Sequence, residues 1–373
     1  MNIVVFYFLL LTFSFVGSAF PQAKSGWEAE WEKTIAAAKA EGKLNAYTFS
    51  GGSELIIHTG LFQKRFPEIK IVTASGDPVP RILAERRAGK YIADVAIGGA
   101  STPWDLYLAK ALDPLKDAMI LPEVLDESKW WQGKHGWIDA ERRYALPFLG
   151  NPQRGAIFYN TKLIRPNDFR SFWDFVNPKW KGKIEARDIR AAGQGTVVVR
   201  FFLHTPGLGA EYIRRLFSEM DITLFRDRRQ SVDWLASGKY PICFFCSSTD
   251  IGRAREQGLP VNEFGEMKEG VGITSSGGNL GLSNRAPHPN AAKVFVNWLL
   301  SREGQIAVQQ SYAQRGNPVN SRRIDIPKDG IPPEGRLREG VHYIEVESSD
   351  RMSMEPALKL FNEALAEAER RKR

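Results

Sequence analysis

The chain has 373 residues, of which 43% are hydrophobic and 25% are charged, so it is long and apolar enough for two folded domains and is not disordered. Its formal net charge of +8 is compatible with nucleic acid, anionic membranes or anionic solutes. The basic residues at 226–229, 322–323 and 370–373 form only short runs without interleaved aromatic residues, so we interpret them as solvated surface and expect no nucleic-acid partner.

The N-terminus carries an uncharged apolar run at residues 3–16, followed by the small residues Gly17, Ser18 and Ala19. This run has the length of a signal-peptide core and is shorter than the roughly 20 residues of a membrane span. No basic residue precedes it, and no cysteine lies near its end that would anchor a lipoprotein. We expect a signal peptide over residues 1–23, cleaved after Ala19 or Ala23, and a periplasmic protein.

Strands alternate with helices from residue 27 to residue 97, which predicts a parallel α/β sheet. The expected elements are a helix at 27–42, a strand at 43–49, a helix at 54–66, a strand at 69–73, a helix at 81–88 and a strand at 92–97.

Small polar residues follow each of these three strands, in the turns at 50–53, 74–77 and 98–102. Ligands of open parallel sheets bind at the carboxyl ends of strands, where helix N-termini offer unpaired N–H groups to anions. Helix capping alone explains any one such turn. Three turns in succession favour a shared binding edge.

The remainder of the chain continues the alternation and then becomes helical. Strands are expected at 157–162, 183–186, 241–245, 271–274 and 280–282, and helices at 197–204, 289–302, 303–311 and 355–373. Residues 323–340 are rich in proline, glycine and charge and are interpreted as a surface excursion.

Catalytic motifs are missing from the sequence. The five histidines are scattered without an H-E-x-x-H pair, and there is neither a G-x-S-x-G elbow nor a Walker loop. The glycine pairs at 193–195 and 270–272 lack the third glycine of a dinucleotide fingerprint. We therefore expect no enzyme activity, no cofactor and no metal.

The only two cysteines, Cys243 and Cys246, form a C-x-x-C pair in a strand-like segment. In an extended chain their Cα atoms would lie roughly 10 Å apart, whereas a disulfide requires about 7 Å or less. Free buried thiols, a structural disulfide, and a metal or redox site all remain open, and the strand-like context favours the free thiols.

Three stretches, at residues 83–95, 158–184 and 286–305, resemble the family 1 extracellular solute-binding proteins of bacterial ABC importers. The likeness is greatest to the branch that includes the ferric-iron-binding proteins. It extends over roughly residues 27–320.

The resemblance implies a type II periplasmic binding fold, in which two α/β domains joined by extended crossings close on a solute like a hinged clam. We expect domain I to comprise residues 24–147 and 277–373, and domain II residues 148–276. The first crossing is expected near 145–148 and the return near 277–282. The implied partners are a small solute and an inner-membrane ABC permease, and the chain is expected to be a monomer.

The candidate ligand-binding residues lie in the turns already described and at their counterparts in domain II. They are Ser50, Gly51, Gly52, Ser53, Ser75, Gly76, Gly99, Ser101, Thr102, Asn151, Arg154, Gln194, Gly195, Thr196, Ser247, Ser248, Thr249, Asp250, Asn279 and Arg315. Hydroxyls, backbone N–H groups and arginines suit a small oxyanion such as a carboxylate, phosphate or phosphonate.

The chain departs from the ferric-binding branch, whose adjacent tyrosines align near residues 245–248. It has no Tyr-Tyr pair, and Phe245 and Cys246 do not supply the hard oxygen ligands that Fe³⁺ prefers. The alternatives that we weigh are a ferric-iron, polyamine or thiamine receptor, and, from another class, a sensor or an enzyme on the same scaffold.

Overall fold

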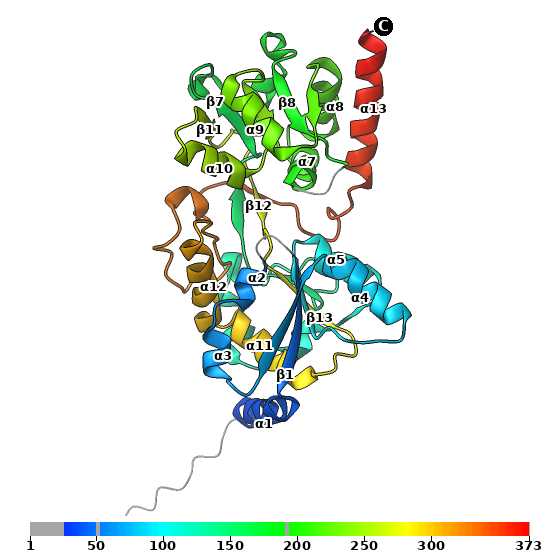
Figure 1. Ribbon diagram of the computed structural model, residues 1–373, viewed down its shortest axis with the longest axis vertical. Coiled ribbons are helices and arrows are strands. Elements are labelled where there is room, and N and C mark those ends of the chain that lie inside the picture. Colours follow the sequence, from blue (N-terminus) through cyan, green and yellow to red (C-terminus); the bar gives the residue numbers. More distant parts are fainter. Residues whose placement is uncertain (1–25, 50–52, 191–193, 373) are drawn as a thin grey trace, which may run out of the picture.

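Two α/β domains stand one above the other, joined by extended strands (Figure 1). The computed structural model describes residues 26–49, 53–190 and 194–372. The expected signal peptide therefore lies outside the described residues. The strands form a six-stranded sheet, a five-stranded sheet and a small three-stranded sheet.

The first domain is built on the six-stranded sheet, in the order β2-β1-β3-β13-β4 with β5 also paired to β13. Its strands are β1 (Lys43–Phe49), β2 (Lys70–Gly76), β3 (Val95–Gly98), β4 (Leu112–Asp113), β5 (Ala145–Pro147) and β13 (Asn279–Ser283). β1 runs parallel to β2 and β3, but β13 is antiparallel to β3, β4 and β5. The sheet is thus mixed, and the expected parallel arrangement holds only for its first three strands.

Helices on both faces of this sheet bury its apolar side chains. They are α1 (Gly26–Glu41), α2 (Glu54–Ile57), α3 (Leu61–Arg65), α4 (Pro78–Arg87), α5 (Ser101–Leu108), α6 (Pro122–Leu125), α11 (Pro289–Leu300) and α12 (Arg302–Gln314). The rings of Phe62, Phe295 and Trp298 pack together, with centroids 5.3–6.1 Å apart. The expected helix 54–66 is broken because Gly60 adopts a left-handed conformation (φ 72°) between α2 and α3.

The second domain is built on the five-stranded sheet, in the order β11-β7-β10-β8-β9. Its strands are β7 (Ile157–Asn160), β8 (Ile184–Arg187), β9 (Thr223–Phe225), β10 (Ile242–Phe244) and β11 (Val261–Glu263). Its helices are α7 (Gln194–His204), α8 (Gly209–Glu219), α9 (Arg228–Ser237), α10 (Ser248–Glu256) and α13 (Glu355–Lys372). Short 3₁₀ helices lie at Leu115–Ala118, Glu127–Lys129, Trp131–Gly133, Pro166–Asp168, Phe172–Val176, Pro178–Trp180 and Pro333–Gly335.

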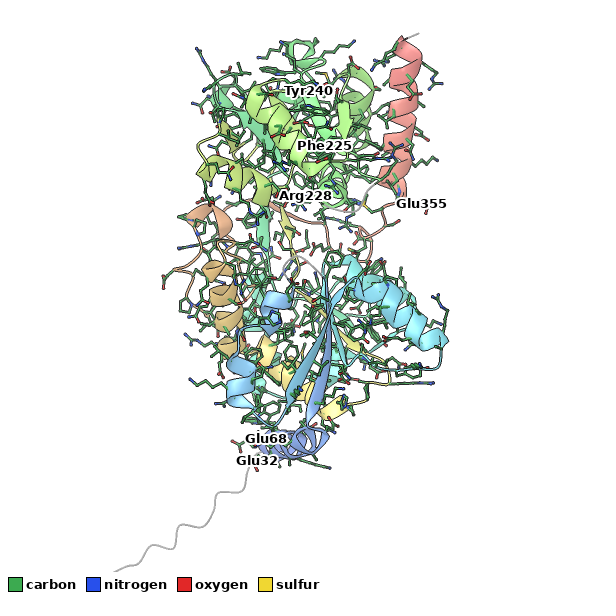
Figure 2. The ribbon with its side chains drawn as sticks, viewed as in Figure 1. Glu32, Glu68, Phe225, Arg228, Tyr240 and Glu355 are labelled. Atoms are coloured by element: carbon green, nitrogen blue, oxygen red, sulfur yellow. A yellow bond between two sulfur atoms is a disulfide. The ribbon has the colours of Figure 1, made fainter. Side chains whose placement is uncertain are left out.

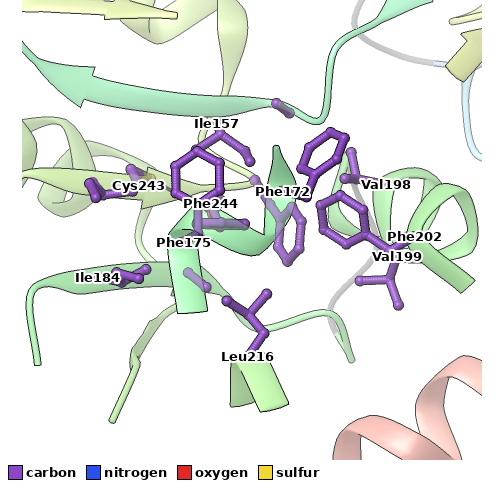
Figure 3. Close-up of a cluster of buried hydrophobic side chains, with 14 of the residues drawn as sticks. Ile157, Phe172, Phe175, Ile184, Val198, Val199, Phe202, Leu216, Cys243 and Phe244 are labelled. Atoms are coloured by element: carbon purple, nitrogen blue, oxygen red, sulfur yellow. Dashed lines mark hydrogen bonds between the residues drawn. The ribbon is translucent and has the colours of Figure 1, made fainter. Parts of the chain in front are cut away.

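An aromatic core fills the second domain. Phe172, Phe175, Phe202 and Phe244 are fully buried and contact one another edge to face (Figure 3). Sequence analysis did not predict α8, α9, α10, β9 or β11.

The C-terminal helix α13 belongs to this second core, although the sequence analysis placed residues 277–373 in domain I. Phe361 of α13 is fully buried, and its ring centroid lies 4.7 Å from that of Phe217 on α8. Figure 1 shows α13 standing beside α8, far from the first sheet. The apolar face of this amphipathic helix, and not its place in the sequence, decides which domain it packs against.

Three strands cross between the domains and form the third sheet: β6 (Asn151–Gln153), β12 (Val271–Thr274) and β14 (Tyr343–Glu345). β12 lies in the middle, antiparallel to β6 and parallel to β14. The stretches expected as crossings, 145–148 and 277–282, instead largely form β5 and β13 of the first sheet. The resemblance implied two or three crossings, but the position of the third, β14, was not predicted.

Buried charges bind the crossings together. Arg322 donates to both carboxylate oxygens of Glu345 (2.7 and 3.1 Å) and to the carbonyl oxygen of Leu149 (3.0 Å). Glu347 accepts hydrogen bonds from the N–H of Ser275 and the hydroxyl of Thr274. Burial raises the pKa of Glu347. Arg322 and Arg323 are 3% and 1% exposed, so their interpretation as solvated surface was wrong.

The two cysteines form a disulfide, and the preference for free thiols was wrong. The chain does not stay extended after β10: Phe245 adopts a positive φ of 63°, which turns the backbone and brings the two Cα atoms to 6.0 Å. Both cysteines are fully buried. Sequence patterns gave no sign of this turn because phenylalanine rarely adopts a left-handed conformation.

Candidate ligand-binding site

The predicted residues of the first domain gather at the carboxyl ends of its parallel strands. Ser75 and Gly76 close β2, in register with Thr48 and Phe49 at the end of β1. Gly99 lies between β3 and α5, and Ser101 is the first residue of α5. Ser50, Gly51 and Gly52 lie outside the described residues.

Some of these residues hold the edge together. The hydroxyl of Ser53 donates to the carbonyl oxygen of Gly277 (3.1 Å). Asn279 is fully buried and donates to the carbonyl oxygen of Gly98 (3.1 Å) and to the hydroxyl of Ser275. Thr102 is also buried. Ser53 thus joins the start of α2, and Asn279 joins the end of β3, to the segment that leads into β13.

Two further predicted residues lie by the crossing strands. Asn151 on β6 donates to the hydroxyl of Ser276 (3.1 Å) and accepts from the N–H of Asn320 (2.8 Å). Arg154 forms an ion pair with Glu263 (2.9 Å) and donates to the carbonyl oxygen of Glu334. Their polar groups already have partners within the protein.

The second domain presents a matching edge, because β8, β9 and β10 are parallel and end at the same level. Ser247 follows β10 as the N-cap of α10, and its hydroxyl accepts a hydrogen bond from the N–H of Asp250 (3.3 Å). Ser248 and Thr249 are exposed in the first turn of that helix. The expected binding loop at 247–250 is thus a helix N-terminus, where polar groups and anions are favoured.

Arginines that the sequence analysis did not select occupy this edge. Asp188, just after β8, pairs with Arg190 (2.8 Å) and Arg226 (3.3 Å). The hydrogen bonds from the Arg190 guanidinium lower the pKa of Asp188 to about 2. Asp188 is therefore an anion at neutral pH and holds the two guanidinium groups together.

A second cluster lies beside the first. Arg228, at the start of α9, donates to Asp250 (2.9 Å) and to the hydroxyl of Ser247 (2.8 Å). Asp250 also lies 3.9 Å from Arg253. The two clusters contain four guanidinium groups and two carboxylates, an excess of two positive charges. Figure 2 shows Arg228 at the end of the second domain that faces the first.

The remaining predicted residues flank these edges. Gln194, Gly195 and Thr196 begin α7, and a Cβ added to Gly195 would lie 3.1 Å from Ile189. Arg315 is exposed at the end of α12, a helix tied to α2 by a hydrogen bond from Ser311 to the carbonyl oxygen of Leu55.

The two edges oppose each other across the crossing strands. In Figure 1, α7 and α10 lie on the side of the second domain that faces the first, while α2 and α5 lie on the facing side of the first domain. The geometry suits a small solute held between hydroxyls of one domain and arginines of the other. The sequence signal for the arginines was the run 226–229. Its place at the carboxyl edge of the sheet follows only once β9 is known to end at Phe225.

The comparison with solved structures identifies this architecture as the type II periplasmic binding fold. The protein IdiA (FutA) from Trichodesmium, solved in complex with iron and citrate, matches with a TM-score of 0.65 at 18% identity, covering 87% of this chain and 99% of that one. The ferric-binding protein of Campylobacter jejuni matches with a TM-score of 0.63 at 14% identity over 86% and 99% of the two chains. AfuA from Actinobacillus pleuropneumoniae, solved with fructose-6-phosphate, matches with a TM-score of 0.58 at 18% identity over 88% and 99%.

Residues 49–306 match the family model described as bacterial extracellular solute-binding protein, and the chain belongs to that family. The family consists of binding proteins that serve transport, not of enzymes. No curated protein matches the chain at a significant level of sequence similarity.

Two further findings concern the helices and the metal-ligating residue types. Within residues 26–49, 53–190 and 194–372, no helix has both the length and the apolar character of a membrane span. In the same part of the chain, Glu185, Cys243 and Cys246 are the one group of three metal-ligating residue types close together, and its two sulfur atoms are joined in the disulfide.

Proposed function

We propose that the protein is the periplasmic receptor of an ABC importer, and that it captures a small oxyanionic organic solute by closure of its two domains. The solute class is a carboxylate, phosphate or phosphonate. The receptor then delivers the solute to an inner-membrane permease, and it acts as a monomer exported by the signal peptide of residues 1–23.

The arginines at the carboxyl edge of the second sheet carry this proposal. The side chains of Arg190, Arg226 and Arg228 are 47%, 78% and 54% exposed, so each keeps donors available to a ligand. Their carboxylate partners hold them in place before a ligand arrives, which lowers the entropic cost of binding. Guanidinium groups bind planar or tetrahedral oxyanions through two parallel hydrogen bonds.

The same edge argues against direct coordination of iron. Phe245 and Cys246 occupy the loop where ferric-binding relatives are expected to place tyrosines, and both are buried. A positively charged edge also disfavours a polyamine or thiamine.

A thermal-shift screen of the mature chain tests the proposal. The panel contains carboxylates including citrate, phosphonates, sugar phosphates including fructose-6-phosphate, polyamines, thiamine and ferric salts. A ligand at 100 times its Kd stabilises the folded state by about 2.7 kcal/mol. We expect at least one organic oxyanion to raise the melting temperature, and a shift with ferric ion or cations alone would refute the anion assignment.

Arg228→Ala is expected to weaken binding of the oxyanion found in that screen about 10- to 100-fold, because a charged hydrogen bond contributes roughly 1.5–3 kcal/mol. Isothermal titration calorimetry measures the change. The matched control is Arg214→Ala, which removes an exposed arginine of α8 that forms an ion pair with Glu211 in the preceding turn. Equal affinity of Arg228→Ala and wild type would show that the solute binds elsewhere.

A further inference from the structure

A carboxyl group without a hydrogen-bond partner lies in the core of the second domain. Glu185, in the middle of β8, is fully buried, and neither of its side-chain oxygens has a hydrogen bond. Burial without a partner is costly for a carboxyl group. Such a group in a folded protein calls for a chemical explanation.

The disulfide is the neighbour of this carboxyl group. Cys243 on β10 is the strand partner of Glu185, so their side chains project from the same face of the sheet. A carboxyl oxygen of Glu185 and the sulfur atoms of Cys243 and Cys246 all lie within 4.8 Å of one another. Figure 3 shows Cys243 among the apolar side chains of this core, near Ile184 and Phe244.

Glu185 holds a proton at neutral pH. Burial raises its pKa to about 9, and only the positive charge of Lys239 opposes this effect. The disulfide beside it does not titrate. A neutral acid thus lies within reach of both sulfur atoms.

The two sulfur atoms have different surroundings. Cys246 directly precedes Ser247, the N-cap of α10, and the positive end of a helix dipole stabilises a thiolate there. Cys243 lies within a strand among apolar side chains, where a thiolate is unfavourable. If the disulfide is reduced, the sulfur of Cys243 therefore needs a proton at once, and Glu185 is placed to supply it.

We propose that Cys243, Cys246 and Glu185 form a thiol–disulfide redox site in which Glu185 donates the proton to the departing sulfur of Cys243. The reductant is a dithiol. Its thiolate attacks the sulfur of Cys246, the disulfide bond breaks, and its electron pair passes to Cys243, which takes the proton of Glu185. The second thiol of the reductant loses its proton to solvent and displaces Cys246, which leaves as a thiolate at the N-terminus of α10. The dithiol becomes a disulfide, two electrons enter the protein, and Glu185 regains a proton from solvent.

Reduction of the folded protein by dithiothreitol tests this assignment. The rate of disulfide reduction is measured from pH 6 to pH 10. The released thiols are alkylated, and mass spectrometry detects the added mass. The quantity of interest is the rate of wild type divided by that of Glu185→Gln at each pH. The reactivity of the reductant and the opening of the buried loop contribute to both rates and largely cancel in this ratio.

The ratio is expected to be about ten or more at pH 7, within the lower range of general acid catalysis. It should fall towards one as the pH passes about 9, because Glu185 then loses its proton. Glu185→Asp keeps an acid in place and is expected to retain a pH-dependent advantage over Glu185→Gln. Glu211→Gln, an exposed position on α8, serves as the control and should match wild type.

A ratio that stays constant over this pH range would assign Glu185 a purely structural effect and overturn the proposal. Purified protein whose two thiols react with an alkylating agent in denaturant without prior reduction would overturn it as well. Melting temperatures of each variant, measured in parallel, show that the compared proteins are folded.

Discussion

Replacing Arg322 with alanine is expected to reduce the free energy of unfolding by about 3 kcal/mol. Arg322 is 3% exposed, and its guanidinium joins Glu345 on the third crossing strand to the carbonyl oxygen of Leu149 before the first. Removing one partner of a buried ion pair costs roughly 3–5 kcal/mol. The lower end applies here because the side chain of Glu345 is 37% exposed and water can solvate it.

Differential scanning calorimetry measures this loss. Arg143→Ala provides the comparison, since Arg143 and Asp117 form an ion pair of similar length whose side chains are 44% and 60% exposed. Such a surface pair contributes about 0–1 kcal/mol. If Arg322→Ala and Arg143→Ala lost equal stability, the ion pair of Arg322 with Glu345 would not be what holds the crossing strands together.

Replacing Glu185 with glutamine is expected to change how stability depends on pH. The pKa of Glu185 rises from 4.5 in the unfolded chain to about 9 in the fold. Between these values the unfolded chain releases a proton that the folded protein keeps, so rising pH favours unfolding. This group alone removes at most about 1.4 kcal/mol of stability per pH unit, and the loss is absent in the glutamine variant.

The stability of wild type minus that of Glu185→Gln should therefore decrease from pH 5 to pH 8 by roughly 1 kcal/mol per unit. Calorimetry at four pH values measures it and separates the transitions of the two domains. Glu185→Asp, which keeps a buried acid, is expected to follow wild type. A difference that does not vary with pH would mean that Glu185 is ionised in the folded protein.

Local patterns in the sequence were sufficient for the first three strands of the first domain. The strand at 43–49 has the predicted bounds of β1, and the strands before the small polar turns end where β2 and β3 end to within a few residues. These segments are regular: apolar strands alternate with amphipathic helices, and glycine or proline marks their ends. The family resemblance then supplied the second domain and the fold as a whole.

The parts that sequence reasoning missed depend on contacts between distant residues. β9 has only three residues, and without it the arginines at 226 and 228 seemed to be ordinary surface. The side chain of Arg322 packs against Gly136 and Gly150. A Cβ atom added to these glycines would lie 2.6 Å and 3.0 Å, respectively, from the Arg322 side chain. No local pattern reveals that an arginine 170 positions or more along the chain fills the space beside these glycines.

The disulfide illustrates the same limit at short range. Its formation depends on the backbone angle of one residue, Phe245, whose ring packs against Phe202 and Phe217 in the core. Propensity alone favours an extended phenylalanine. Tertiary packing overrides that preference.

The membership of α13 in the second domain places the two ends of the described chain on different bodies. α1 lies at the far end of the first domain and α13 ends at the far end of the second (Figure 1). Both native cysteines are occupied in the disulfide, so Lys33→Cys on α1 and Glu363→Cys on α13, each at an exposed position, would introduce the only free thiols. With a donor and an acceptor dye on these thiols, ligand binding could be followed by fluorescence. Any approach of the two domains changes the energy transfer between the dyes.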